Sequence, residues 1–268
     1  MDKTAFIYIH GVQPNIKTAN IKGYSKKTHE RILKHLKRSG KDVSRIKRFE
    51  IVWADVTFPF KKGLAAYQFD ADFKKGRKRR GGKLGIPKLL RNFVYPVVVD
   101  IIFYVKNKGS SEAPGEMIVL ERLHKAVKKA KKEGFRKVVI FAHSLGSVAA
   151  YDYIFRFRKK YSFPKDMKLS TLITFGSPIG LFASSMGYPM SSKIEKPSYA
   201  KKWVNFWDHD DAVAGRCEPH FPEKFVKGFL RDVAVDTAFI NPLKAHERYW
   251  SDRKVIKQMA EEIVSSSS

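Results

Sequence analysis

The chain has 268 residues and a mass of 30.8 kDa, and 43% of its residues are hydrophobic and 13% aromatic. This apolar content excludes a wholly disordered chain, and no apolar run approaches the ~18 residues of a membrane span. The single cysteine, Cys217, excludes an internal disulfide scaffold. Lysine and arginine number 53 against 26 acidic residues, so the net charge of +27 attracts polyanions such as nucleic acid or anionic lipid.

The chain begins MDKTAFIYIHG, with an acidic residue at position 2 and no long apolar region. A secretory signal peptide needs a longer apolar segment than this. We therefore expect no signal peptide and a cytoplasmic location.

Short apolar runs and an amphipathic stretch alternate at the start of the chain. The run at 4–9 predicts a buried strand that ends in a turn at His10-Gly11. Residues 25–38 predict an amphipathic helix, because apolar residues recur among basic ones at helical spacing. The run at 49–53 predicts a second strand.

The alternation resumes after a long interruption at residues 57–113. The further predicted elements are a helix at 115–132, a strand at 137–142, a helix from about Leu145, strands at 169–175, 202–207 and 229–235, a helix at 253–264, and a disordered tail at 265–268. Strands that alternate with helices predict an α/β fold, with a mostly parallel sheet covered by helices on both faces. We expect one domain over residues 1–268, with 57–113 as an insertion.

The strongest local signal is the sequence Ala142-His143-Ser144-Leu145-Gly146, which lies between a predicted strand and a predicted helix. A serine flanked by small residues can occupy a tight, strained turn that exposes its hydroxyl above a sheet. Small residues are needed at 142 and 146 because the two backbones approach closely there. Ser144 is therefore predicted to be a nucleophile. The plain alternative is an ordinary turn in which Ser144 caps the helix.

Four landmarks in chain order resemble the α/β-hydrolase superfamily, specifically its lipase-like serine esterases. They are IYIHG at 7–11, similar to the strand and oxyanion turn; AHSLG at 142–146, similar to the nucleophile elbow; TFGSP at 174–178, similar to a strand-end motif of lipase-type members; and NFWDHDDAVA at 205–214 with AHERYW at 245–250, similar to the acid and histidine loops. The resemblance covers nearly the whole chain except roughly 57–113. It implies an α/β-hydrolase fold and a triad in the chain order Ser, Asp, His.

A neutral hydroxyl is a weak nucleophile, so Ser144 needs a base beside it. The resemblance assigns this base to His246, which follows the last predicted strand; a surface histidine that caps the final helix is the alternative. His220 is the second candidate. We expect His143 to pack beside the turn and point away from Ser144, and the ring of His10 to orient the oxyanion turn.

The triad acid must accept from the imidazole N–H, fix its tautomer and stabilise the imidazolium. Three aspartates crowd one loop: Asp208, Asp210 and Asp211. In lipase-like relatives the acid is followed by a small or hydrophobic residue and then valine, and Asp211-Ala212-Val213 matches this pattern. The resemblance therefore favours Asp211, with Asp208 as the alternative. The other aspartates are expected to cap and turn the loop.

Two backbone N–H groups are predicted to form the oxyanion hole. One belongs to Leu145, after the nucleophile, and the other to Val12, after the supporting turn at His10-Gly11. Gly11 permits a turn that a side chain would hinder.

Ser177 and Cys217 are the other side chains with nucleophilic atoms that we considered from the sequence. Ser177 lacks the small flanking residues of an elbow, so we expect a structural role in its loop, and we expect Cys217 to pack in the interior. The sequence has no cysteine–histidine cluster with zinc spacing, no P-loop and no dinucleotide-binding glycine motif. We therefore expect neither a metal nor a cofactor.

The insertion combines a basic run with an apolar one. Seven cations fall between Lys74 and Lys83, and without them the net charge of +27 is still +20, so most of the surplus is spread over a basic surface. Residues 93–105 carry only one charge, on Asp100. This apolar segment is either a buried core element, a lid over the active site or an interfacial anchor. Together the two runs predict peripheral docking on an anionic membrane.

These features predict a serine ester hydrolase. The resemblance favours a lipid or acylglycerol ester as substrate, and a thioester or amide stays open. The alternative is a catalytically inactive hydrolase-fold protein that binds anionic lipid or nucleic acid through its basic surface. All three triad residue types in the expected order argue against that alternative. The run at 74–83 lacks interleaved aromatic residues, so we expect no specific nucleic-acid binding.

Overall fold

The computed structural model describes residues 3–11, 22–55, 101, 104, 114–186, 194–237 and 242–266. The chain divides into two compact units. The first consists of Met1–Gly11, Gly23–Ile51 and Leu120–Ser268, and the second of Val12–Lys22 and Val52–Val119.

The second unit has few described residues. Two of them, Trp53 and Tyr104, are almost fully buried. Apart from Ile101 and Tyr104, the predicted insertion at 57–113 lies outside the described residues, and so do its basic run and most of its apolar run. The organisation as one domain with an insertion therefore stays a prediction.

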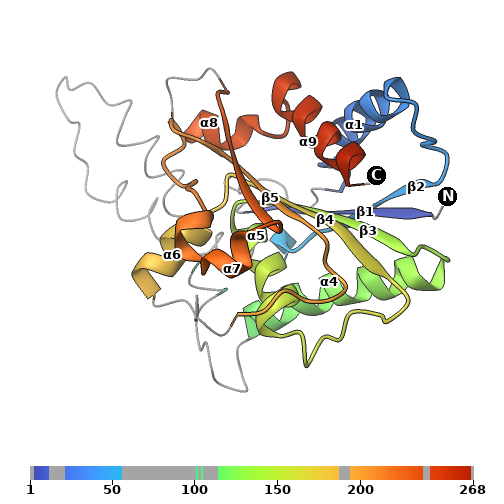
Figure 1. The fold of residues 1–268 in the computed structure, drawn as a ribbon, viewed down its shortest axis with the longest axis horizontal. Coiled ribbons are helices and arrows are strands. Elements are labelled where there is room, and N and C mark those ends of the chain that lie inside the picture. The colour runs from blue at the N-terminus through green and yellow to red at the C-terminus, as the bar shows by residue number, and fades with distance from the viewer. Residues whose placement is uncertain are drawn as a thin grey trace, which may run out of the picture. The chain divides into compact units, whose positions relative to one another are not determined.

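The first unit is built on one all-parallel sheet in the order β2-β1-β3-β4-β5-β6 (Figure 1). The strands are β1 (Thr4–Ile9), β2 (Ile46–Ile51), β3 (Lys137–His143), β4 (Lys168–Phe175), β5 (Trp203–Asp208) and β6 (Leu230–Val235). Helices cover both faces of a parallel sheet, so its inner strands read as nearly continuous apolar runs. β1 and β3 follow this rule, because almost every residue of both strands is buried. The structure confirms the predicted α/β class.

Two helices cover one face of the sheet (Figure 1). They are α1 (Lys26–Arg38) and α9 (Arg253–Ser265). Side chains at every second position of a strand point to this face, and they form one buried cluster with Ile32 and Leu36 of α1 and Ile256 and Met259 of α9. Thr28 Oγ1 of α1 also donates to the Trp250 carbonyl oxygen at 2.6 Å, which ties the start of α1 to the turn before α9.

The opposite face carries α5 (Leu145–Tyr151) and the part of α4 (Pro114–Lys132) that belongs to this unit (Figure 1). On the predicted helix at 115–132, Leu120, Leu123 and Val127 are fully buried and form the apolar stripe of α4. The other short helices are a π-helical turn at Asp152–Arg156, α6 (Ile179–Met186), a 3₁₀ turn at Glu218–His220, α7 (Glu223–Val226) and α8 (Pro242–Arg248).

Two sequence predictions need correction, and three short helices were not predicted. β2 occupies Ile46–Ile51 rather than 49–53, because it pairs with β1 from Thr4 opposite Ile46 to Ile9 opposite Ile51. As an edge strand, β2 tolerates the exposed Lys47 that hid its start in the sequence. The predicted disordered tail at 265–268 is wrong at its start, because Ser265 ends α9. The short helices α6, α7 and α8 were not predicted, since few residues give each a periodic pattern.

Candidate active site

Ser144 lies on a strained turn between β3 and α5. Its backbone angles are φ 52° and ψ −132°. It is the one non-glycine residue with a positive φ in the described part of the chain. Such a backbone conformation costs about 1–3 kcal/mol and persists only where its surroundings enforce it. The Ser144 N–H donates to the Phe175 carbonyl oxygen of β4 at 3.1 Å, and its side chain is 4% exposed.

Two glycines allow the backbone to crowd around this serine. A Cβ on Gly11 would lie 2.3 Å from the Ser144 Cβ, and a Cβ on Gly146 would lie 2.5 Å from the His10 carbonyl oxygen. Both distances are too short for real atoms, so each position requires glycine. His10 is buried, and its Nδ1 lies 2.6 Å from the Gly11 carbonyl oxygen. Since a carbonyl only accepts, Nδ1 donates and ties the ring to the turn.

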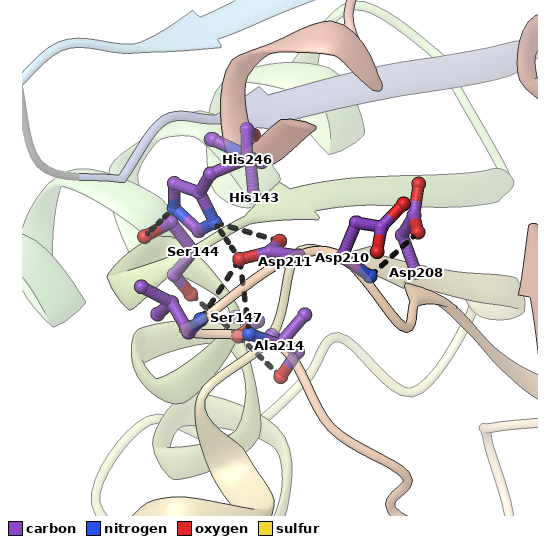
Figure 2. Close-up of polar contacts among 10 residues, drawn as sticks. His143, Ser144, Ser147, Asp208, Asp210, Asp211, Ala214 and His246 are labelled. Atoms are coloured by element: carbon purple, nitrogen blue, oxygen red, sulfur yellow. Dashed lines mark hydrogen bonds and ion pairs between the residues drawn. The ribbon is translucent and has the colours of Figure 1, made fainter. Parts of the chain in front are cut away.

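His246, on α8, faces the hydroxyl of Ser144. Its Nε2 lies 2.8 Å from the Ser144 Oγ, and the His246 ring lies between Ser144 and Asp211 (Figure 2). The His246 Nδ1 lies 2.8 Å from Asp211 Oδ2 and 3.0 Å from Asp211 Oδ1. A carboxylate only accepts, so Nδ1 carries the proton, and Nε2 of the uncharged ring is left to accept from the serine hydroxyl.

Asp211 is buried in the loop after β5. The N–H groups of Val213 and Ala214 donate to its Oδ1 at 2.9 and 3.2 Å. Burial alone would raise the pKa of this carboxyl, but the hydrogen bond and charge of His246 and the two N–H donors outweigh it, so the pKa of Asp211 is lowered. The carboxylate is therefore charged at neutral pH and oriented before any substrate arrives.

Asp208 makes different contacts at the end of β5. Its Oδ1 accepts from the Asp210 N–H at 3.0 Å, and its Oδ2 accepts from the Thr237 N–H at 2.7 Å. Figure 2 shows the Asp208–Asp210 contact apart from the His246 ring. Of the two candidate acids, Asp211 is the one that contacts His246.

The serine turn at the end of a parallel strand, followed by a helix, and the chain order Ser, Asp, His are the defining features of one architecture. The chain has the α/β-hydrolase fold. In this fold Ser144 follows β3, Asp211 lies in the loop after β5, and His246 lies on α8, in the segment after β6.

Comparisons with known proteins add little detail. No protein-family model and no curated protein matches the sequence. A candidate hydrolase of the α/β superfamily from Xanthomonas campestris pv. campestris is 13% identical with a TM-score of 0.38, over 96% of this chain and 98% of that one. The NocB thioesterase domain, in covalent complex with a fluorophosphonate nocardicin G analog, is 10% identical with a TM-score of 0.40, over 99% and 95%.

The remaining sequence candidates lie around this candidate site or outside it. The Leu145 N–H is at the first turn of α5, where helix N–H groups have no partner within the helix. Val12 lies outside the described residues, so the second oxyanion donor stays a prediction. His220, in the 3₁₀ turn at 218–220, lies beside Gly180, 2.9 Å from where a Cβ on that glycine would be.

His143 has a positioning contact that sequence reasoning missed. Its Nε2 lies 2.8 Å from the His246 carbonyl oxygen, so it must donate there. Burial first, and then the neighbouring His246, lower the pKa of His143 to about 3, which keeps the ring neutral. The residue before Ser144 therefore holds the backbone of the histidine that faces Ser144. Only the residue's type was visible in the sequence, because its partner is 103 positions away.

Buried neutral histidines make the stability of this chain sensitive to mild acid. Burial and the charge of Arg48 also lower the pKa of His29 to about 4. A histidine in the unfolded chain titrates near 6.5, so between pH 6.5 and about 4 the unfolded state binds more protons and stability falls as the pH falls. We expect each of the two histidines to contribute a loss of up to about 2 kcal/mol by pH 5.

Urea unfolding at pH 7, 6 and 5 measures this loss. His29→Gln should reduce the pH dependence, while His209→Asn, which removes an exposed histidine, should leave it unchanged. Equal pH dependence in wild type and His29→Gln would show that His29 is not the titrating group.

A buried chain of hydroxyls lies behind Ser144. Ser147 Oγ donates to the Ser144 carbonyl oxygen at 2.5 Å and lies 2.7 Å from Ser177 Oγ. The single proton of Ser147 goes to the Ser144 carbonyl oxygen, so Ser177 Oγ donates to Ser147 and accepts from the Ile179 N–H at 3.3 Å. Ser177 also accepts from the Gly215 N–H through its carbonyl oxygen, at 3.2 Å. Ser177 thus links the turn at Ser144 to the loop that carries Asp211.

Ser147→Ala is expected to slow reaction at Ser144 about tenfold, because the strained carbonyl loses one of its two donors. The measurement is the rate of labelling by a fluorophosphonate probe, together with kcat and KM on a chromogenic ester. The change should fall on kcat and spare KM. Ser170→Ala is the matched control, because its hydroxyl also donates to a backbone carbonyl oxygen, that of Val138 at 3.0 Å, at the far end of β4. Equal rates for the two variants would contradict the expectation.

The described residues offer neither a metal-binding cluster nor a membrane-spanning helix. No group of three or more histidine, cysteine, aspartate or glutamate side chains there is arranged to hold a metal ion. No helix in the same ranges is long and apolar enough to cross a membrane.

Proposed function

We propose that the protein is a serine hydrolase that cleaves carboxylic esters. One observation carries the proposal: an unbroken line of hydrogen bonds runs from Ser144 Oγ through His246 to Asp211, with 2.8 Å at each step. This arrangement allows a base to take the serine proton while a buried carboxylate stabilises the resulting imidazolium.

The reaction follows from this geometry in two halves. Ser144 Oγ attacks the ester carbonyl carbon as its proton passes to His246 Nε2, and the Leu145 N–H donates to the oxyanion. The intermediate expels the alcohol, which takes the proton from His246, and an acyl-enzyme on Ser144 is left. A water molecule then gives its proton to His246 and attacks the acyl carbon, and Ser144 leaves with the proton as the acid is released.

A lipid-like ester is the substrate class that we propose. Support for it comes from the TFGSP segment at 174–178, which resembles lipase-type members. In this chain the segment also holds Ser177, whose hydroxyl lies behind the nucleophile. The same triad chemistry also cleaves thioesters and amides. The alcohol and acyl groups of the substrate are therefore tested separately from the hydrolase activity.

Labelling with a fluorophosphonate probe, read by intact mass, tests the hydrolase proposal. Stoichiometric labelling of the folded protein supports it, and a panel of p-nitrophenyl esters from acetate to palmitate then tests the lipid-like part. A preference for acetate would contradict a lipid substrate. A folded protein that stays unlabelled with and without detergent would favour the inactive, polyanion-binding alternative.

Peripheral docking through the basic and apolar runs of 57–113 is a further part of the proposal. In the apolar run the structure describes Ile101 and Tyr104, and Tyr104 is almost fully buried; the basic run lies outside the described residues. Liposome co-sedimentation tests it: deletion of the run at 74–83 should weaken binding to anionic vesicles at low salt, and unchanged binding would contradict it.

A further inference from the structure

The helices α1 and α9 border a groove that is lined by basic side chains. The groove has a volume of about 540 Å³, and its lining comprises Arg31, Lys34, His35 and Arg38 of α1 with Arg253, Lys254, Ile256 and Lys257 of α9. Six of these eight side chains are cations, and none is acidic. We propose that this groove docks the protein on the surface of an anionic membrane, through the phosphates of acidic lipids.

The charge of this groove is largely uncompensated. Lys257 pairs with Glu261 at 3.6 Å, and the other five cations form no ion pair with an acidic side chain in the described part of the chain. Lys34, Arg38, Arg253 and Lys254 are exposed to solvent. Like charges on two adjacent helices repel one another, so a surface rich in phosphates would stabilise this arrangement.

A second groove shows that such charge is not a general property of the surface. It is lined by Lys201, Lys202, Lys227 and Arg231, but also by Glu261 and Glu262. Glu262 accepts from Lys202 at 2.5 Å and from Arg231 as well, so two of the four cations in this second groove have an acidic partner. The α1–α9 groove is therefore distinct even on a chain with a net charge of +27.

The lining chemistry favours a membrane over single-stranded nucleic acid. A groove for single strands of nucleic acid needs aromatic side chains on which bases stack. The groove contains no tyrosine, tryptophan, phenylalanine, asparagine or glutamine, and its one aliphatic side chain, Ile256, is buried. A bilayer surface requires only positive charge spread over an exposed face.

One end of the groove contacts the segment that follows His246. Arg31 donates to the Ser251 carbonyl oxygen at 2.7 Å, and Ser251 lies five residues after His246. Docking through the α1–α9 face would hold the edge of the sheet that bears Ser144 close to the lipid. The inference concerns binding alone and does not depend on the proposed hydrolase activity.

Vesicle co-sedimentation with two matched triple variants tests the inference. The first variant reverses three groove charges (Lys34→Glu, Arg38→Glu, Lys254→Glu). The second reverses three exposed lysines elsewhere (Lys201→Glu, Lys224→Glu, Lys227→Glu). Both variants change the net charge equally. Vesicles of 30% phosphatidylglycerol in phosphatidylcholine are compared with pure phosphatidylcholine, at 50 and 300 mM salt.

Each cation near an anionic bilayer strengthens binding roughly fivefold, so the groove variant should lose about a hundredfold or more in partition coefficient. The control variant should lose less than about tenfold, and high salt should weaken binding of the wild type. Ser144→Ala should bind vesicles like the wild type, so the binding test does not depend on whether the protein is a hydrolase. Thermal unfolding confirms that each variant is folded.

Three results would overturn the inference. Equal losses in both triple variants would assign binding to the total charge, and binding to pure phosphatidylcholine would assign it to apolar contacts. If a 20-base-pair DNA duplex, at equal phosphate concentration, displaces the protein from vesicles and the groove variant loses DNA binding to the same degree, the occupant is nucleic acid.

Discussion

Ser144→Ala is expected to abolish fluorophosphonate labelling and to lower ester hydrolysis roughly 10⁶-fold, the loss typical of a nucleophile in a triad. Its Oγ is the hydroxyl oxygen that lies 2.8 Å from His246 Nε2. Intact mass spectrometry measures the labelling, and Ser170→Ala, at the far end of β4, should label like the wild type. Labelling of the Ser144→Ala protein would show that another residue is the nucleophile.

The same position allows a test of stored strain. Alanine keeps the Cβ that makes a φ of 52° unfavourable, so Ser144→Ala should unfold near the wild-type temperature. Glycine adopts positive φ without a steric penalty, so Ser144→Gly should unfold at a higher temperature than Ser144→Ala. The two inactive variants would then separate the cost of the backbone turn from the loss of the hydroxyl. Equal melting temperatures would show that the turn is not strained.

Local patterns in the sequence were enough for most of the sheet. Five strands were visible as apolar runs because buried parallel strands need them, and β1 and β3 are the clearest cases. β2 was displaced by a few residues, because an edge strand keeps polar side chains that mask its start. α8 was missed, since seven residues are too few for a periodic pattern, although its His246 was singled out by resemblance.

The contacts that orient the candidate site could not be predicted, because they join distant segments. His143 reaches the carbonyl of His246, 103 residues away, and Ser147 reaches Ser177 across 30 residues. Ser177 drew attention in the sequence only as a possible second nucleophile. Its place behind Ser144 depends on how closely the loops after β3 and β4 approach, which no local pattern records.

Asp211→Asn is expected to lower kcat about 10⁴-fold. An asparagine amide can turn its N–H₂ group toward His246 Nδ1, which would then have to accept. Nε2 would carry the proton and could no longer accept one from Ser144. Val213 and Ala214 donate to the Asp211 oxygen, and the amide oxygen of asparagine can still accept from them, so this variant should keep its fold. Stopped-flow or steady-state assay on a chromogenic ester measures the loss, with thermal unfolding beside it.

Asp208→Asn is the matched comparison in the same loop. Its carboxylate accepts from the N–H groups of Asp210 and Thr237 and makes no contact with the His246 ring. Loss of its charge should weaken the end of β5, so we expect a lower melting temperature and a change in kcat of less than about tenfold. The two variants thus separate an acid that acts on the histidine from one that supports the loop. If Asp208→Asn lost 10⁴-fold in kcat with an unchanged melting temperature, Asp208 would be the triad acid.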